Sequence, residues 1–236
     1  MALTDLVTPL SKRQTLGADV YSQIRELLIS GRMMPGEQIS LRTTAQALGV
    51  SVMPVREAVY QLVAEQALEV TPNRAIRVPR ITVSQFLEIT AIRIHVEGLA
   101  AQRAAQTASP ALVAELHACN EALSHEMGAY EPDASRLIAL NKTLHFGVYR
   151  AAGMPILLQM IESLWLRIGP ILNYDLRSGS TRVKQRTAAG HHARLIEALR
   201  RHDGNGAYEA LKGDIDSAAQ YIISAGVLVT ADDLPA

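Results

Sequence analysis

Three short helical segments, each closed by residues that break a helix, follow one another in the first third of the chain. Apolar residues of the first segment share one helical stripe, which ends before Gly31: Val20, Ile24, Leu27 and Leu28. Ser40 and Gly49 bracket the second segment. Ser51 opens the third, and Pro54 falls in its first turn, where a missing N–H costs nothing. This order predicts a helix-turn-helix.

Two extended pieces follow the third segment, Ala67 to Thr71 and Ile76 to Pro79. A turn at Pro72-Asn73-Arg74 joins them, which predicts a hairpin. Residues 16–80 therefore predict a winged helix-turn-helix, with the hairpin as the wing. A generic small α+β domain is the alternative that the pattern alone leaves open.

The remainder of the chain shows helical stripes and no convincing strand. Proline and glycine breakers separate six predicted helices, at 82–107, 110–128, 132–151, 155–177, 181–202 and 204–225. Six helices with short links predict a bundle, in which ligand and metal sites lie between facing helices. The expected chain is mainly α, with an arm at 1–15, a winged domain at 16–80, an all-α helical bundle at 81–228 and a tail at 229–236.

Composition excludes several classes of protein. With 48% apolar residues among 236, the chain can bury a sizeable core. A single cysteine, Cys119, excludes an intramolecular disulfide and a cysteine-rich metal module. Apolar runs are too short for a membrane-spanning helix and the N-terminus lacks a signal-peptide pattern, so we expect a cytoplasmic protein with no membrane partner.

The charge distribution is weakly asymmetric although the net charge is zero. Residues 1–80 hold 9 basic and 7 acidic residues, a net charge of +2, and residues 81–236 hold 14 and 16, a net charge of −2. The sign of this asymmetry suits an N-terminal part that faces DNA.

The pattern of helix breakers, caps and apolar positions in residues 16–80 resembles the winged helix-turn-helix of the GntR family of transcription regulators. The matching residues are Ile29-Ser30-Gly31 with Pro35-Gly36, Ala45 with Leu48-Gly49-Val50-Ser51, and Pro54-Val55-Arg56-Glu57-Ala58 with Leu62. Val52 departs from the family, which usually has arginine there, and Ala75 stands where the family has a wing glycine, so we expect a wider turn. The resemblance implies binding to double-stranded DNA at a palindromic operator.

The first turn of a recognition helix enters the major groove, so its side chains meet base edges. Arg56 can donate to guanine or hold a phosphate, Ser51 can donate to a phosphate, and Arg74 at the wing tip can enter the minor groove. For each arginine, a solvated surface charge is the alternative. We expect seven residues at the DNA: Arg42, Ser51, Val52, Met53, Pro54, Arg56 and Arg74.

Residues 82–225 resemble the FCD-type ligand domain of the FadR-like GntR branch. The matches are Ala91 to Glu97, Asn141 with His145, His192 with Leu195-Ile196 and Ala198-Leu199, and Asp203 with Ala207. Many such domains hold a divalent metal with one aspartate and three histidines. The resemblance places these ligands at Asn141, His145, His192 and Asp214. Because two of the four have changed, a site for Zn²⁺ or another divalent ion and a metal-free polar pocket both stay open.

Arg93 is expected to point inward, where a buried arginine needs a partner. Glu97 would supply an internal ion pair, whereas the family resemblance favours a carboxylate-bearing effector. For Trp165, core packing is the alternative, and Tyr174 is a further candidate for the same cavity. His191 and the other histidines, His95, His117, His125 and His202, are expected at the surface. We expect six residues at the effector: Arg93, Asn141, His145, Trp165, Arg167 and His192.

The function expected from these features is a homodimeric transcription regulator, a repressor, whose binding to an operator is controlled by a small carboxylate-bearing effector. It is not expected to be an enzyme. A metal-dependent hydrolase built on the helical bundle is the alternative, since two histidines and an aspartate can activate water around an ion. The chain holds no HExxH, Walker, GxSxG or dinucleotide motif that would favour an enzyme.

Overall fold

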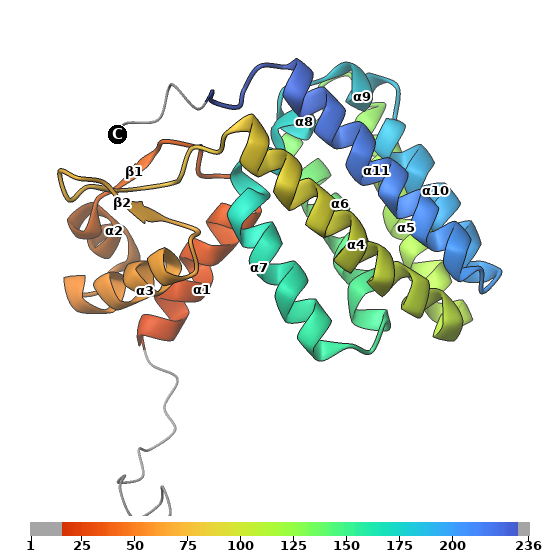
Figure 1. Ribbon diagram of the computed structural model, residues 1–236, viewed down its shortest axis with the longest axis horizontal. Helices are drawn as coiled ribbons and strands as arrows, with labels where there is room; N and C mark the ends of the chain where they lie inside the picture. Colours follow the sequence, from red (N-terminus) through yellow and green to blue (C-terminus); the bar gives the residue numbers. More distant parts are fainter. Residues whose placement is uncertain (1–15, 231–236) are drawn as a thin grey trace, which may run out of the picture.

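The computed structural model describes residues 16–230 and shows a mainly α chain with a small winged domain packed against a larger helical bundle (Figure 1). The predicted arm at 1–15 and residues 231–236 of the predicted tail lie outside the described residues. The first residue of that tail, Val229, is described and lies beside the start of the bundle. Its N–H donates to the carbonyl oxygen of Ile81 at 3.2 Å.

The winged domain has the predicted order of elements, with one added strand. Its helices and strands are α1 (Leu16–Ile29), β1 (Gln38–Ile39), α2 (Leu41–Leu48), α3 (Val52–Ala64), β2 (Glu69–Val70) and β3 (Ile76–Arg77). The antiparallel sheet has the order β1-β3-β2, and Ile76 lies opposite both Ile39 and Val70. Strand β1 was not predicted, because two residues are too few to show an alternating pattern.

Local sequence signals set the ends of these helices. The Thr43 N–H donates to Ser40 Oγ at 3.3 Å at the start of α2, and Gly49 ends that helix at φ +66°. Two details of the prediction were wrong. Leu27 is exposed while Ile29 is buried, and the wing strands are shorter than expected because Ala67 and Leu68 turn into the core.

The bundle follows the predicted helices but interrupts two of them. Its helices are α4 (Val83–Thr107), α5 (Pro110–Met127), α6 (Ala134–Ala151), α7 (Pro155–Leu172), α8 (Tyr174–Arg177), α9 (Thr181–Lys184), α10 (Thr187–Arg200) and α11 (Gly204–Ser224). The expected helix at 155–177 breaks after Leu172, where Pro170 removes a hydrogen bond from the last turn. The expected helix at 181–202 breaks at Arg186, which has φ +52°.

Helix α7 joins the two parts of the molecule (Figure 1). A Cβ atom on Gly169 would lie 2.5 Å from the carbonyl oxygen of Leu28, so only glycine permits this approach of α7 to α1. The Asn173 side chain donates to the carbonyl oxygen of Ile29 at 3.0 Å. One apolar core therefore runs from α1 into the bundle, where it includes Trp165.

Helix α7 also raises the question of a membrane. Within residues 16–230 it is the one helix long and apolar enough to cross a bilayer, yet half of that stretch is buried inside the protein. It packs against α1 on one side and α4 on the other, as the central helix of a folded core does.

Candidate functional site

The first turn of α3 presents its side chains to solvent. Ser51 precedes the helix and its hydroxyl makes no capping hydrogen bond, so the hydroxyl can serve an outside partner. Val52 is half-buried against the core of the winged domain, which limits its expected role at DNA. Pro54 is also half-buried, whereas the exposed members of the predicted set are Arg42, Ser51, Met53, Arg56 and Arg74.

The wing turn accommodates alanine where the family has glycine. Arg74 adopts the left-handed conformation at φ +63°, so Ala75 does not need to. The Thr71 N–H donates to the Ala75 carbonyl oxygen at 2.8 Å, and the Arg74 N–H donates back to Thr71 at 2.8 Å. This geometry places the exposed Arg74 side chain at the wing tip, as predicted.

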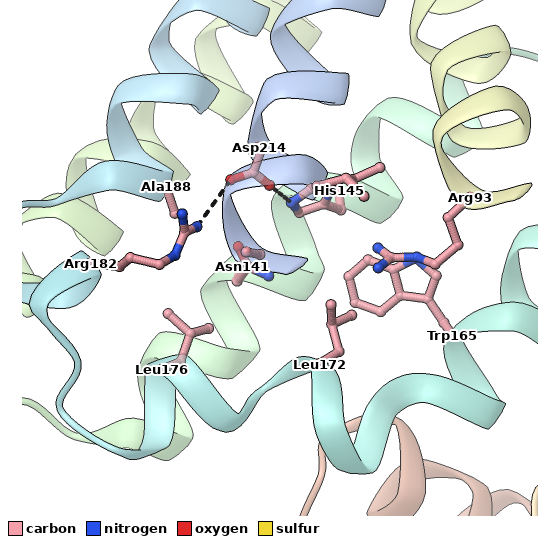
Figure 2. Close-up of a pocket in the computed structure, with 11 residues that line it drawn as sticks. Arg93, Asn141, His145, Trp165, Leu172, Leu176, Arg182, Ala188 and Asp214 are labelled. Atoms are coloured by element: carbon pink, nitrogen blue, oxygen red, sulfur yellow. Dashed lines mark ion pairs between the residues drawn. The ribbon is translucent and has the colours of Figure 1, made fainter. Parts of the chain in front are cut away.

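Three of the four residues predicted as metal ligands meet inside the bundle. His145 comes from α6 and Asp214 from α11 (Figure 2), and His192 comes from α10. The two histidine Nε2 atoms are 3.1 Å apart, and they lie 3.3 and 3.6 Å from the same Asp214 oxygen, Oδ2. Asn141, one turn before His145, lines the same cavity. The side chains of His145, His192 and Asp214 are all buried.

Hydrogen bonds around His145 indicate which ring nitrogen carries its proton. The Tyr149 hydroxyl donates to Glu97 Oε2, and the same hydroxyl lies 2.8 Å from His145 Nδ1. Because that hydroxyl donates its proton to Glu97, His145 Nδ1 must donate to the hydroxyl oxygen, and Nε2 is the ring nitrogen that faces Asp214. The 3.3 Å contact between Nε2 and Asp214 Oδ2 is favourable when a proton or a cation lies between the two atoms.

The donor set fits a divalent ion. With bonds of about 2.0–2.2 Å, the ligands of a tetrahedral zinc ion lie roughly 3.3–3.6 Å apart, close to the three separations in the cluster. Burial alone would raise the pKa of Asp214, but the hydrogen bonds and charges of His145 and His192 hold that pKa well below its ordinary value. Burial lowers the pKa of His192, which favours its neutral, ligating form.

The cavity beside this cluster is small, about 30 Å³. One water needs about 10–15 Å³, so an ion with a water or two would fill it. A small organic acid needs more room than this. The cavity in its present shape therefore suits a metal ion or waters.

Arg93 points inward as expected, and its partner is Glu97. The Arg93 Nε atom lies 2.6 Å from Glu97 Oε1, and both side chains are buried. The Trp165 indole N–H donates to the same carboxylate at 3.1 Å. Burial lowers the pKa of Arg93, but Glu97 outweighs that effect and raises it, so the guanidinium stays charged. The internal pair is thus confirmed, and Arg93 still borders the small cavity.

Trp165 has both of its alternative roles, since it is buried in the core and lines the cavity. Arg167 does not line this cavity. Two residues along a helix turn the side chain about 200° away, and Arg167 Nε donates instead to the Glu65 carbonyl oxygen at 3.2 Å, at the winged domain. The expectation for Arg167 was therefore wrong. Tyr174 does not line the cavity, and His191 is half-buried, with Arg194 2.7 Å from its Nδ1.

Two residues of the site were missed in the sequence. Tyr149 lies one turn after His145, so the spacing of Asn141, His145 and Tyr149 on one helix face was an available signal. Arg182 on α9 approaches Asp214 Oδ1 at 3.9 Å and is buried. The position of Arg182 depends on the break in the chain between α8 and α10, and no local sequence pattern predicts that break.

Comparisons with known families agree with this geometry. The model for bacterial regulatory proteins of the gntR family matches residues 16–78, and the model for the FCD domain matches residues 88–217. The chain belongs to the GntR family. It is a DNA-binding transcription regulator with an FCD domain.

Individual relatives align with most of the chain. The HTH-type transcriptional regulator McbR of Escherichia coli (strain K12) is 32% identical over 200 residues, which are 85% of this chain and 89% of that protein. A solved structure of E. coli McbR/YncC has a TM-score of 0.82 at 30% identity and covers 91% of this chain and 100% of that one. A probable D-xylose utilization operon transcriptional repressor of Paenarthrobacter nicotinovorans is 30% identical over 205 residues, covering 85% and 87%.

Proposed function

We propose that this GntR-family chain is a repressor that binds a palindromic operator as a homodimer and releases it in response to a small anionic effector. Two winged domains would read the two half-sites through Arg56 and the neighbouring exposed residues of α3. Relatives named as repressors support repression over activation. The relatives reported above are named as regulators, which favours this function over the hydrolase alternative. For a regulator of this kind we expect a location in the cytoplasm.

The observation that carries this proposal is that one helix borders both the buried cavity and the winged domain. Helix α7 lines the buried cavity with Trp165 and Leu172, and it contacts α1 of the winged domain through Gly169 and Asn173. A change in the cavity that moves α7 must therefore move or loosen its contact with α1. Effector binding can shift the populations of DNA-competent and DNA-incompetent arrangements by this route.

We propose that the buried cluster holds a divalent metal ion, with zinc as the first candidate. His145, His192 and Asp214 would bind it directly, and Asn141 would hold a water beside it. A bound ion would supply a positive centre for the carboxylate of an effector. The convergence of His145 Nε2, His192 Nε2 and Asp214 Oδ2 and the fit of their three separations support the ion over the metal-free pocket, which is the alternative outcome of the test.

An organic effector requires the cavity to open. Its wall includes Leu176 on α8 and Arg182 on α9, two helices of four residues each. Such short helices are held mainly by packing, so we propose that residues 173–186 move outward to admit the effector. Arg182 would then be placed to meet its carboxylate.

Exposed apolar side chains support the homodimer. Ile92 and Leu99 on α4 and Ile156 and Met160 on the neighbouring α7 are between 37% and 75% exposed. Apolar groups on two packed helices provide a surface that a second copy would cover.

The test of DNA binding is a fluorescence anisotropy titration at fixed salt with a duplex from the region upstream of the gene. We expect binding that is stronger than to a scrambled duplex and that weakens as salt rises. Elemental analysis of the purified protein tests the metal, and we expect about one equivalent. Less than about a tenth of an equivalent after growth with zinc would contradict the metal centre and favour the metal-free pocket.

A further inference from the structure

A second cavity lies at the joint between the winged domain and the bundle, apart from the buried cluster. Its volume is about 370 Å³, an order of magnitude larger than the cavity at His145. The C-terminal end of α1 and the turn after it form one wall, and α6 and α8 form the other. A ligand held here would therefore touch both parts of the molecule.

The walls of this joint cavity carry an excess of positive charge. Arg32 contributes from the winged domain, and Lys142 and Arg177 contribute from the bundle. The acidic lining residue is Glu26, whose two carboxylate oxygens lie 2.7 and 2.6 Å from Lys142 Nζ. That pair neutralises itself across the joint, so the charges of Arg32 and Arg177 remain unbalanced among the lining residues.

Arg177 has a donor nitrogen without a partner. One guanidinium nitrogen, Nη1, lies against the sulfur of Met34, whereas Nη2 is buried and has no hydrogen-bond partner among the side chains and backbone groups that the structure describes. The same Nη2 atom lies 2.5 Å from the point that a Cβ on Gly31 would occupy, so it is aimed at the winged domain. A buried guanidinium donor without an acceptor is unfavourable, and burial lowers the pKa of Arg177 accordingly.

We propose that the joint cavity binds a small oxyanion, a phosphate-sized dianion or a small metabolite that carries phosphate or carboxylate groups. Arg177 and Arg32 bind it from opposite sides of the joint. The Arg177 guanidinium turns away from Met34 into the cavity, where it offers the paired donors that oxyanions accept. The ligand clamps the winged domain to the bundle and so acts as a second input, separate from the effector cavity.

The experiment uses the full chain and inorganic phosphate as the probe. Equilibrium dialysis with radiolabelled phosphate, at constant ionic strength in chloride, measures binding directly, and thermal melts measure the stabilisation that accompanies it. We expect saturable binding of one phosphate per chain with a rise in melting temperature, and competition by sulfate. Competition by citrate at lower concentration would assign the site to carboxylates, and stronger competition by a sugar phosphate would assign it to phosphorylated metabolites.

Four variants test whether the phosphate binds in the joint cavity. Arg177→Gln and Arg32→Gln should each weaken phosphate binding at least tenfold, whereas Arg103→Gln, a change to an exposed arginine at the far end of α4, should leave it unchanged. Arg32 is exposed, so its variant carries the test even where Arg177→Gln does not fold. His192→Ala should retain binding, because the buried cluster is a different site.

Equal phosphate binding by the wild type, Arg32→Gln and Arg177→Gln would overturn the proposal, as would the absence of saturable binding in the wild type. Loss of phosphate binding in a folded His192→Ala variant would overturn it as well, since the anion would then be at the buried cluster.

Discussion

The winged domain and the helical bundle carry their functional residues in opposite ways. In the winged domain the exposed candidates Arg42, Met53, Arg56 and Arg74 lie on two short helices and a turn, and they depend on local geometry. In the bundle they are buried and come from helices that lie up to about 120 residues apart in the chain, from Arg93 to Asp214. We therefore expect the DNA surface to tolerate substitution without loss of fold, and the buried residues of the bundle to contribute to its stability.

The largest expected effect of a single substitution tests that contrast in the bundle. Glu97→Ala leaves Arg93 buried and charged without its partner, and removes the acceptor for Tyr149 and Trp165. We expect a loss of about 3–5 kcal/mol in the free energy of unfolding, measured by urea denaturation. Glu197→Ala, which breaks an exposed pair with Arg200, is the control and should cause no measurable change. Stability of Glu97→Ala within error of the wild type would show that the pair is dispensable.

In the winged domain the expected effect is on binding and not on folding. Arg56→Ala should weaken specific binding to DNA by about 1–3 kcal/mol if the side chain reads a base, with the unfolding curve unchanged. Anisotropy titrations at fixed salt measure the affinity, with Arg103→Ala as the matched exposed control. If the variant binds the operator as tightly as the wild type does, Arg56 lies outside the interface.

Tyr149→Phe separates orientation of the site from packing. The ring keeps its contacts with Phe146 and Trp165, while His145 Nδ1 loses its acceptor. We expect the affinity for zinc to fall about 10–100-fold, because partners of this kind orient a ligating imidazole. Competition with a chromophoric chelator measures it, and Tyr130→Phe, at a fully solvent-exposed side chain, is the control. Unchanged zinc affinity would mean that Tyr149 does not position His145.

Gly169→Ala acts on the contact between the two regions. The added methyl would meet backbone atoms of Leu28 and Ile29, which cannot rotate away, so α1 and α7 must separate slightly. We expect a loss of about 1 kcal/mol in stability, at the low end for overpacking. We also expect a weaker response of operator affinity to metal. Gly190→Ala on α10, where a Cβ has open space, is the control. A full response in Gly169→Ala would argue against α7 as the connection.

The same contrast explains how much the sequence revealed. Ser40, Gly49 and Pro54 act on their immediate neighbours, so the helix-turn-helix corner could be predicted from spacing alone. The six long helices of the bundle were likewise visible as stripes. The breaks after Leu172 and at Arg186 were not, because a left-handed arginine depends on surrounding packing and has no local signal.

The buried cluster needed more than periodicity. Family resemblance supplied Asn141, His145, His192 and Asp214, and the structure brings the last three together. Sequence reasoning proposed Glu97 as the partner of Arg93 through their spacing of four residues, but it could not choose between that pair and a ligand. It placed Arg167 in the cavity, although the side chain lies on the other face of α7, because burial on both sides of a central helix hides which face points where.

The most direct test of the account is the operator dissociation constant of the full chain, measured by anisotropy after metal removal with EDTA and again after zinc is restored. We predict specific, salt-sensitive binding whose affinity differs about fivefold or more between the two states, and a His192→Ala variant whose affinity is the same in both. Identical operator affinity in both states of the wild type, with elemental analysis showing that the metal content had changed, would contradict the proposed link between the buried cluster and the DNA surface.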